Sequence, residues 1–170
     1  MICPSCGYEN LPGAEMCAHC FHDLMGLDVP QPREGLQKHL LEDPISVLPL
    51  RPPVTVSPED SVGRALELMR RHRIGSLLVV EEGKLVGIFT ERGALLQLVG
   101  SSADVNALRM REVMTPDPVV LREDDTLAFA VHQMSLGEFR RLPVVRPDGT
   151  PLGVVSVKDI LRYIFTLCRS

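Results

Sequence analysis

Four of the five cysteines lie within the first twenty residues and form two closely spaced pairs. Two residues separate Cys3 from Cys6 and Cys17 from Cys20, and ten residues lie between the pairs. Two such pairs can place four thiolates at the corners of a tetrahedron around one cation, and zinc suits that geometry best. The residues between the pairs are polar and rich in Gly and Pro, so a bound metal would supply most of the folding free energy of this segment.

The stretch from Cys3 to Leu24 resembles the small zinc ribbons of many prokaryotic proteins. The resemblance implies a structural metal and an adaptor role, because four thiolates leave no open position for water or substrate. Iron in a rubredoxin-like site is the alternative metal. A disulfide framework would require an oxidising compartment. His19 and His22 could substitute as metal ligands, but with four cysteines in register they are expected to be exposed or to lie beside the thiolates.

The composition is that of an ordinary globular protein. Its 170 residues are 45% hydrophobic and 24% charged, which is enough to bury a sizeable core. The net charge of −4 argues against a protein that coats nucleic acid, because such binding relies on Lys and Arg. No signal peptide and no apolar stretch of about 18 residues is found, so we expect a cytoplasmic protein without membrane contact.

Beyond the cysteines, the chain contains an internal repeat at an offset of 65 residues. Residues 1–26 are interpreted as the zinc ribbon and 27–43 as a linker with a short helix that ends before Pro44. Residues 44–105 and 106–170 are interpreted as the two copies of the repeat. The matching residues are Val54, Asp60, Ala65, Met69, Leu77, Val79 and Val80, which recur as Val119, Asp125, Ala130, Met134, Leu142, Val144 and Val145.

Each copy is predicted to fold in the order β-α-β-β-α. In the first copy, residues 54–56 form a strand and Ser57 begins a helix, with Pro58 at its first position. Residues 77–80 and 85–89 form a hairpin, and a second helix starts at Glu91. Each copy leaves one apolar face, and pairing the copies buries both faces. The fold class is therefore α/β in the broad sense (α+β), with two packed units and a small knuckle.

The order of elements and several short segments resemble a tandem CBS-domain (Bateman) module over residues 44–170. The segments are Val113-Met114-Thr115-Pro116, Arg141-Leu142-Pro143-Val144-Val145 and Gly153-Val154-Val155-Ser156-Val157-Lys158-Asp159. The resemblance implies a regulatory module that binds adenosine nucleotides in clefts between the copies and often forms flat homodimers.

The residues themselves also favour a nucleotide site. One carboxylate can hold both ribose hydroxyls, which suits Asp159, and the Ser156 hydroxyl with the Arg140 and Arg141 guanidinium groups suits a phosphate. The resemblance implies that the first copy completes this site through Pro49, Val54, Ile74, Gly75 and Ser76, with adenine near Val54 and Ile74. The pseudo-symmetric site begins at Thr90 but has Gly93 in place of the carboxylate, so we expect it to bind more weakly.

Simpler roles remain open for the same side chains. Ser156 and Asp159 could cap a helix, and the two arginines could form a solvated strand edge. The basic run from Arg70 to Arg73 suits the end of a helix, and His72 or Arg73 could instead line a phosphate site.

We therefore predict a non-enzymatic sensor of an adenosine nucleotide (AMP, ADP or ATP) with a structural zinc ribbon. The two arginines favour a phosphate over the sulfonium of S-adenosylmethionine. The chain shows no nucleophile–base pair, glycine-rich phosphate loop or open metal site. The alternative is a zinc-ribbon adaptor for protein or nucleic acid that uses the repeat as a dimer scaffold. Glu9 and Glu15 in the ribbon count against nucleic acid.

Overall fold

The computed structural model describes residues 2–11, 14–24, 35–100 and 104–168. The chain divides into two compact units, Met1–Gly35 and Leu36–Ser170. The predicted linker 27–34 lies outside the described residues. Within the described ranges, no helix is long and apolar enough to span a membrane.

The N-terminal unit consists of two similar tight turns. The Gly7 N–H donates to the Cys3 carbonyl at 2.9 Å, and the Phe21 N–H donates to the Cys17 carbonyl at 3.0 Å. Gly7 and Phe21 both have positive φ, 72° and 57°, so each turn closes through a left-handed residue. Cys3, Cys17 and Leu24 form a small buried cluster.

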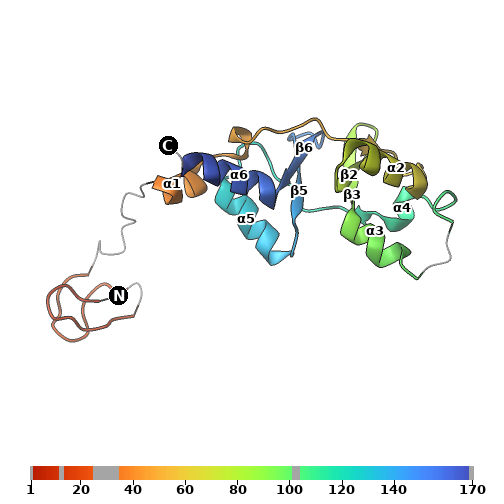
Figure 1. The fold of residues 1–170 in the computed structure, drawn as a ribbon. Coiled ribbons are helices and arrows are strands. Elements are labelled where there is room, and N and C mark those ends of the chain that lie inside the picture. Colours follow the sequence, from red (N-terminus) through yellow and green to blue (C-terminus); the bar gives the residue numbers. More distant parts are fainter. Residues whose placement is uncertain (1, 12–13, 25–34, 101–103, 169–170) are drawn as a thin grey trace. The chain divides into compact units, whose positions relative to one another are not determined.

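The first copy of the repeat follows the predicted order of elements (Figure 1). It contains β1 (Thr55–Val56), α2 (Val62–His72), β2 (Ser76–Glu81), β3 (Lys84–Thr90) and α3 (Glu91–Leu98). Strand β4 (Thr115–Pro116) completes a four-stranded sheet of order β1-β2-β3-β4, in which β1 and β2 are parallel and the other pairs antiparallel. Val62, Ala65 and Met69 form the buried face of α2, and Leu66 beside them is partly buried against the same core.

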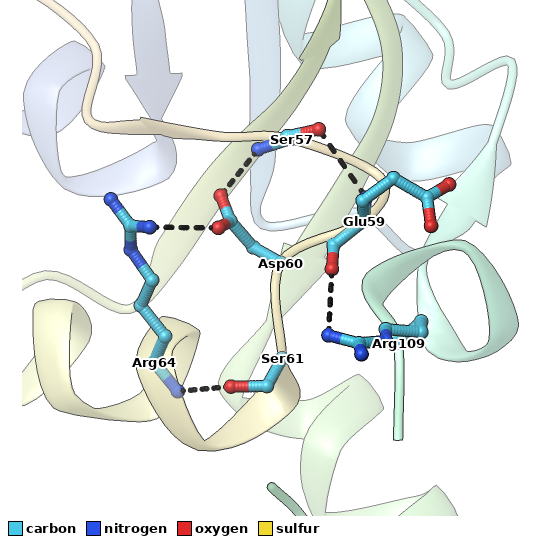
Figure 2. Close-up of polar contacts among 6 residues, drawn as sticks. All are labelled: Ser57, Glu59, Asp60, Ser61, Arg64 and Arg109. Carbon is cyan, nitrogen blue, oxygen red and sulfur yellow. Dashed lines mark hydrogen bonds and ion pairs between the residues drawn. The ribbon is translucent and has the colours of Figure 1, made fainter. Parts of the chain in front are cut away.

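The predicted start of α2 at Ser57 is wrong. The helix begins at Val62, and the Ser61 hydroxyl accepts its capping hydrogen bond from the Arg64 N–H. Figure 2 shows the reason: the Asp60 carboxylate accepts from the Ser57 N–H at 2.8 Å and from the Arg64 guanidinium at 2.9 Å. These contacts hold Ser57–Asp60 as a turn, which the Arg109 side chain supports by donating to the Glu59 carbonyl at 3.0 Å.

The second copy repeats this arrangement with a shorter sheet. It contains α5 (Leu127–Leu136), β5 (Arg141–Val145), β6 (Pro151–Ser156) and α6 (Val157–Leu167), and β5 pairs antiparallel with β6. Its predicted first strand is reduced to a single parallel bridge between Leu121 and Val144. The remaining elements are α1 (Gly35–Glu42), the predicted short helix, η1 (Ile45–Val47) and α4 (Met110–Val113).

Each copy completes its core with a segment that precedes the other copy. Ile45 and Leu48 belong to the core of the second copy, whereas Met110 and Val113 belong to that of the first. Equivalent hydrogen bonds anchor the two segments: Ile45 N–H donates to the Asp125 carbonyl at 2.7 Å, and Met110 N–H to the Asp60 carbonyl at 2.9 Å. Ile45 and Met110 are separated by the 65 residues of the repeat offset. Each packs in the core of the copy that does not directly follow it in the sequence.

The hairpin ends of the two copies also touch. Lys84 Nζ lies 3.2 Å from Asp148 Oδ2, and the Leu85 N–H donates to the Gly149 carbonyl at 3.1 Å. The Thr150 N–H and hydroxyl, together with Lys84, lower the pKa of Asp148 to about 2. The carboxylate is therefore charged at neutral pH and available to Lys84.

Candidate functional site

The four N-terminal cysteines form a compact group of sulfur atoms. Their Sγ atoms all lie within 4.8 Å of one another, with 3.6 Å separating Cys3 from Cys20 and Cys6 from Cys17. Four sulfurs bound to one zinc ion at about 2.3 Å would lie about 3.8 Å apart. The donor set and its spacing therefore fit a tetrahedral metal ion, in a zinc-ribbon-like knuckle.

N–H groups surround one of these thiols. The His19 N–H donates to Cys17 Sγ at 3.4 Å, and the Asn10 amide donates at 3.6 Å. Burial alone would raise the pKa of the Cys17 thiol, but hydrogen bonds from the backbone of Cys20 and His19 and from Asn10 lower it to about 6. Such donors favour the thiolate, which is the form that binds a metal.

The second candidate site centres on the start of α6. Ser156 caps this helix, and its N–H and hydroxyl donate to Asp159 Oδ2 at 2.9 and 2.5 Å. The capping role that the sequence left open is therefore present. Asp159 Oδ1 lies 3.5 Å from the Arg162 guanidinium, and the Asp159 side chain is 33% exposed. A carboxylate in this position retains acceptor capacity toward the solvent.

Arg141 connects this helix start to the first copy. It pairs with Ser156 across β5 and β6, and its Nη1 donates to the Gly75 carbonyl at 3.1 Å. Its Nη2 lies 3.8 Å from the Glu91 carboxylate at the start of α3. Gly75 makes room for this contact, because a Cβ there would lie 2.3 Å from Arg141 Nη2. Of the predicted residues, Asp159, Ser156, Arg141 and Gly75 thus form one chain of contacts.

The remaining predicted residues are less closely joined. Ser76 is buried in β2 next to Gly75, Val54 and Ile74 pack partly against the first core, and Pro49 is exposed. Leu50 and Arg51, which follow Pro49, approach Gly153 of β6, where the Arg51 carbonyl would lie 2.9 Å from an added Cβ. The Ile74 side chain lines a cavity of about 720 Å³ beside α2 and α3.

A larger cleft, of about 1160 Å³, opens on the pseudo-symmetric side. Thr90 lines it together with Arg140, Arg141 and Ser156, whereas Asp159 does not. Thr90 caps α3 by accepting from the Gly93 N–H at 3.1 Å, as Ser156 caps α6. Gly93 corresponds to Asp159 in the repeat and has no side chain that could accept from the Thr90 N–H, as Asp159 accepts from the Ser156 N–H.

Sequence reasoning did not assign Glu91, Phe139 or Lys158 to a site, although all three line this cleft. The repeat offset could have identified Phe139, because it aligns with Ile74. No sequence pattern predicts the contact between Glu91 and Arg141, because it depends on how the two copies pack.

Comparison with known proteins places this architecture. The family model described as "CBS domain" matches residues 45–100 and 110–166. The CBS domain pair of protein MJ0100, solved in complex with 5'-methylthioadenosine and S-adenosyl-L-methionine, is 27% identical with a TM-score of 0.65, over 72% of this chain and 96% of that chain. The structure of CBSX2, a protein from Arabidopsis thaliana, in complex with AMP is 28% identical with a TM-score of 0.64, over 74% and 98%.

An inosine-5'-monophosphate dehydrogenase of Korarchaeum cryptofilum is 38% identical over 111 residues, which are 65% of this chain. The chain spans only about a fifth of that enzyme's length, since the match covers 22% of it. The likeness is thus to one part of the enzyme. Two family matches, in the two repeat copies that the structure pairs, show that the chain belongs to the CBS domain family and carries a tandem pair.

Proposed function

We propose that the protein is a non-enzymatic sensor that binds an adenosine nucleotide between its two CBS units, with a structural zinc ion in the N-terminal knuckle. The contact chain Asp159–Ser156–Arg141–Gly75 carries this proposal, because it joins a carboxylate, a hydroxyl and a guanidinium from one copy to the backbone of the other. The adenosine compounds in the structures of MJ0100 and CBSX2 support the ligand class.

Each group has a distinct task in this proposal. Asp159 accepts from the ribose hydroxyls, while Arg141 and Arg140 bind the phosphate. Val54 and Ile74 contribute apolar surface for the adenine. Arg141 contacts both copies, so a ligand that binds it can act on how the copies pack. The ligand shifts the balance between two arrangements of the copies only if it binds one arrangement more tightly than the other.

Calorimetric titration of the zinc-loaded chain with AMP, ADP, ATP and S-adenosylmethionine tests the proposal. Asp159→Asn retains an oxygen that can cap α6 but removes the charge, so we expect affinity to fall about 10- to 100-fold, as for loss of a charged hydrogen-bond partner. Asp60→Asn, a carboxylate-to-amide change at a residue that lines neither cavity, is the matched control. Equal affinity in the Asp159→Asn variant and the wild type would contradict the assigned role.

The N-terminal knuckle is proposed to bind a protein partner. Ile2, Leu11, Met16 and Phe21 are between 60% and 81% exposed, and residues 1–24 contain no Lys or Arg. Such a surface suits apolar contact with a protein and lacks the cations that nucleic acid requires.

We also propose that the CBS units form a homodimer. Apolar side chains are exposed on several of their helices. They are Leu95 and Leu96 of α3, Phe129 and Val131 of α5, and Leu161 and Phe165 of α6. A second copy of the chain would remove this area from water.

A further inference from the structure

The two turns of the N-terminal knuckle differ at one matched position. An offset of 14 residues relates the turns, so Cys3 matches Cys17 and Gly7 matches Phe21. Gly7 and Phe21 both have positive φ, and each donates its N–H to the cysteine that starts its turn. Glycine adopts this left-handed conformation readily, whereas a Cβ approaches the backbone too closely there. The second turn therefore holds a phenylalanine where the matching turn has a glycine.

Packing does not account for the choice of phenylalanine at this position. The Phe21 side chain is 75% exposed and lies outside the small buried cluster of the knuckle. A bulky residue with positive φ is a backbone outlier, and such strain is concentrated where a side chain has a function. Among the described residues, the other non-glycine residues with positive φ are all charged: Arg73, Glu82, Asp117 and Glu138. An exposed aromatic side chain held in a strained turn is suited to anchor a protein interface.

The residues that flank each turn pair an apolar side chain with a carboxylate. Ile2 forms an antiparallel bridge with Glu9, and Met16 forms one with Asp23. Side chains of directly opposed residues lie on the same face, with Cβ atoms about 5 Å apart. All four residues are exposed. The same combination of apolar and acidic side chains thus occurs twice on the surface of the knuckle.

The charge of the knuckle is negative. Glu9, Glu15 and Asp23 are exposed, and residues 1–24 contain no Lys or Arg. Four thiolates around one zinc ion would add about two negative charges. A partner that covers this surface needs cations opposite the carboxylates, because a charge without a partner is costly to remove from water.

An aromatic pair favours the same kind of partner. The Tyr8 and His19 rings stack with their centroids 5.5 Å apart and their planes at 15°, which joins one turn to the other. The Tyr8 side chain is 46% exposed. The face of an aromatic ring attracts Lys and Arg side chains, so exposed rings beside carboxylates suit a basic partner.

We propose that the knuckle, with Phe21 as its anchor, binds a protein segment that combines aliphatic side chains with Lys and Arg. This inference rests on the protein-binding role proposed above and specifies the chemistry of the partner. The aliphatic side chains of the segment contact Phe21 and Met16, and its cations face the neighbouring carboxylates. A second copy of the knuckle is disfavoured as the partner, because like charges would then meet.

The variant Phe21→Gly separates a binding role from a structural one. Glycine relieves the left-handed backbone, and removal of an exposed side chain leaves no cavity. The variant should therefore hold zinc at least as tightly as the wild type in competition with a chelator, while partner affinity should fall at least about tenfold. Weaker zinc binding in Phe21→Gly would show that Phe21 is a structural residue and would overturn its role as anchor.

Fluorescence anisotropy with three synthetic peptides tests the chemistry of the partner on the full-length, zinc-loaded chain. The first peptide contains only Leu and Lys, spaced as on an amphipathic helix. The second has Glu in place of each Lys, and the third has Ser in place of each Leu. We expect only the Leu–Lys peptide to bind with an affinity that Phe21→Gly lowers. Glu9→Gln and Glu15→Gln should each weaken it about two- to fivefold, and high salt should reduce this difference.

Two variants in the CBS units control for binding elsewhere on the chain. Phe165→Ala removes an exposed aromatic side chain of α6, and Glu67→Gln removes an exposed carboxylate of α2. Both variants should bind the Leu–Lys peptide as the wild type does. Weaker binding in Phe165→Ala together with unchanged binding in Phe21→Gly would place the peptide on the CBS units and overturn the proposal.

The basic partner and the protein-binding role fail separately. If the Leu–Glu peptide binds in a manner that depends on Phe21 and the Leu–Lys peptide does not, the knuckle binds protein but the basic partner is excluded. If no peptide shows binding that depends on Phe21, both are overturned. If Phe21→Gly lowers the mass of the assembly in analytical ultracentrifugation, the surface joins copies of this chain, which also overturns the basic partner.

Discussion

The Arg141 side chain crosses from the second copy to the first at a position where the first copy has no side chain. An added Cβ at Gly75 would lie 2.3 Å from Arg141 Nη2 and 2.6 Å from Glu91 Oε2. Both of these atoms are at the ends of flexible side chains, so they can move aside. The cost of the change would then appear in the contact between the copies and in ligand binding, while the backbone stays in place.

We predict that Gly75→Ala displaces the Arg141 guanidinium and breaks its hydrogen bond to the residue 75 carbonyl. Nucleotide affinity should fall about three- to tenfold, and stability should fall by about 1 kcal/mol. Calorimetry and urea unfolding measure the two effects. Gly93→Ala is the control: it lies in α3, where an added Cβ has only Thr90 Oγ1 nearby at 3.3 Å, so nucleotide affinity at Asp159 should not change. Unaltered affinity in Gly75→Ala would show that Arg141 does not bind the ligand from this position.

At this scale the sequence predicts part of the site. The spacing from Ser156 to Asp159 and the repeat offset are local signals, and the structure joins these residues as neighbours. The sequence indicates neither that Arg141 also meets Glu91 nor that Asp159 faces Arg162, because those contacts depend on side-chain reach after packing. The ligand roles of all these residues stay predictions.

At the scale of elements, a polar cluster ties the end of α1 to α6. The Tyr163 hydroxyl donates to Asp43 Oδ2, and His39 Nδ1 lies 2.8 Å from the same oxygen. The Tyr163 hydroxyl and, secondarily, His39 hold the pKa of Asp43 below its usual value of 3.8, although burial opposes them. The Asp43 carboxylate in turn raises the pKa of Tyr163. These shifts make the cluster a pH-sensitive contribution to stability.

We predict that Tyr163→Phe destabilises the protein by about 1–2 kcal/mol at pH 7, as for loss of a hydrogen bond to a charged group at a partly exposed site. The pKa of Asp43 is lowered in the folded state, so its contribution is fully present above about pH 4 and is lost as the pH falls through the folded value. Wild type should therefore lose more stability than Tyr163→Phe between pH 5 and pH 3. Urea unfolding across this range measures the difference, and parallel pH curves for the two proteins would refute it.

The elements also show where sequence patterns reach their limit. The strands and the buried face of α2 follow from the apolar pattern, and the structure confirms them. The start of α2 does not follow from the apolar pattern, because Ser57 and Ser61 both offer a capping hydroxyl. In the structure the Asp60 carboxylate accepts from the Ser57 N–H and holds Ser57 in a turn, so the helix begins after Ser61. In the second copy, residues 119–121 match the strand pattern, yet only Leu121 forms a bridge with its neighbour.

At the scale of the whole molecule, the four-cysteine cluster and the CBS pair lie in different compact units, so we expect them to unfold independently. We predict one zinc ion per chain, whose removal by a chelator unfolds the N-terminal unit and leaves the melting temperature of the CBS pair within about 2 °C. Metal analysis, with circular dichroism before and after chelation, measures both.

Two cysteine variants provide the control for this prediction. Cys17→Ser removes one of the four clustered sulfurs and should abolish stoichiometric zinc, whereas Cys168→Ser, at an exposed cysteine outside the cluster, should retain it. If metal analysis finds iron in place of zinc, the identity of the metal changes but the four-cysteine site stands. Full metal content in Cys17→Ser would exclude the four-thiolate arrangement.

The exchange of Ile45 and Met110 between the two cores has a consequence for ancestry. A polypeptide with a single copy of this repeat would bury its apolar face incompletely, since the segment that finishes its core would extend away from it. The same segment of a second molecule would complete the core of such a chain. A two-chain ancestor with reciprocally lent segments, later fused into one gene, would give the present connectivity without any change in packing.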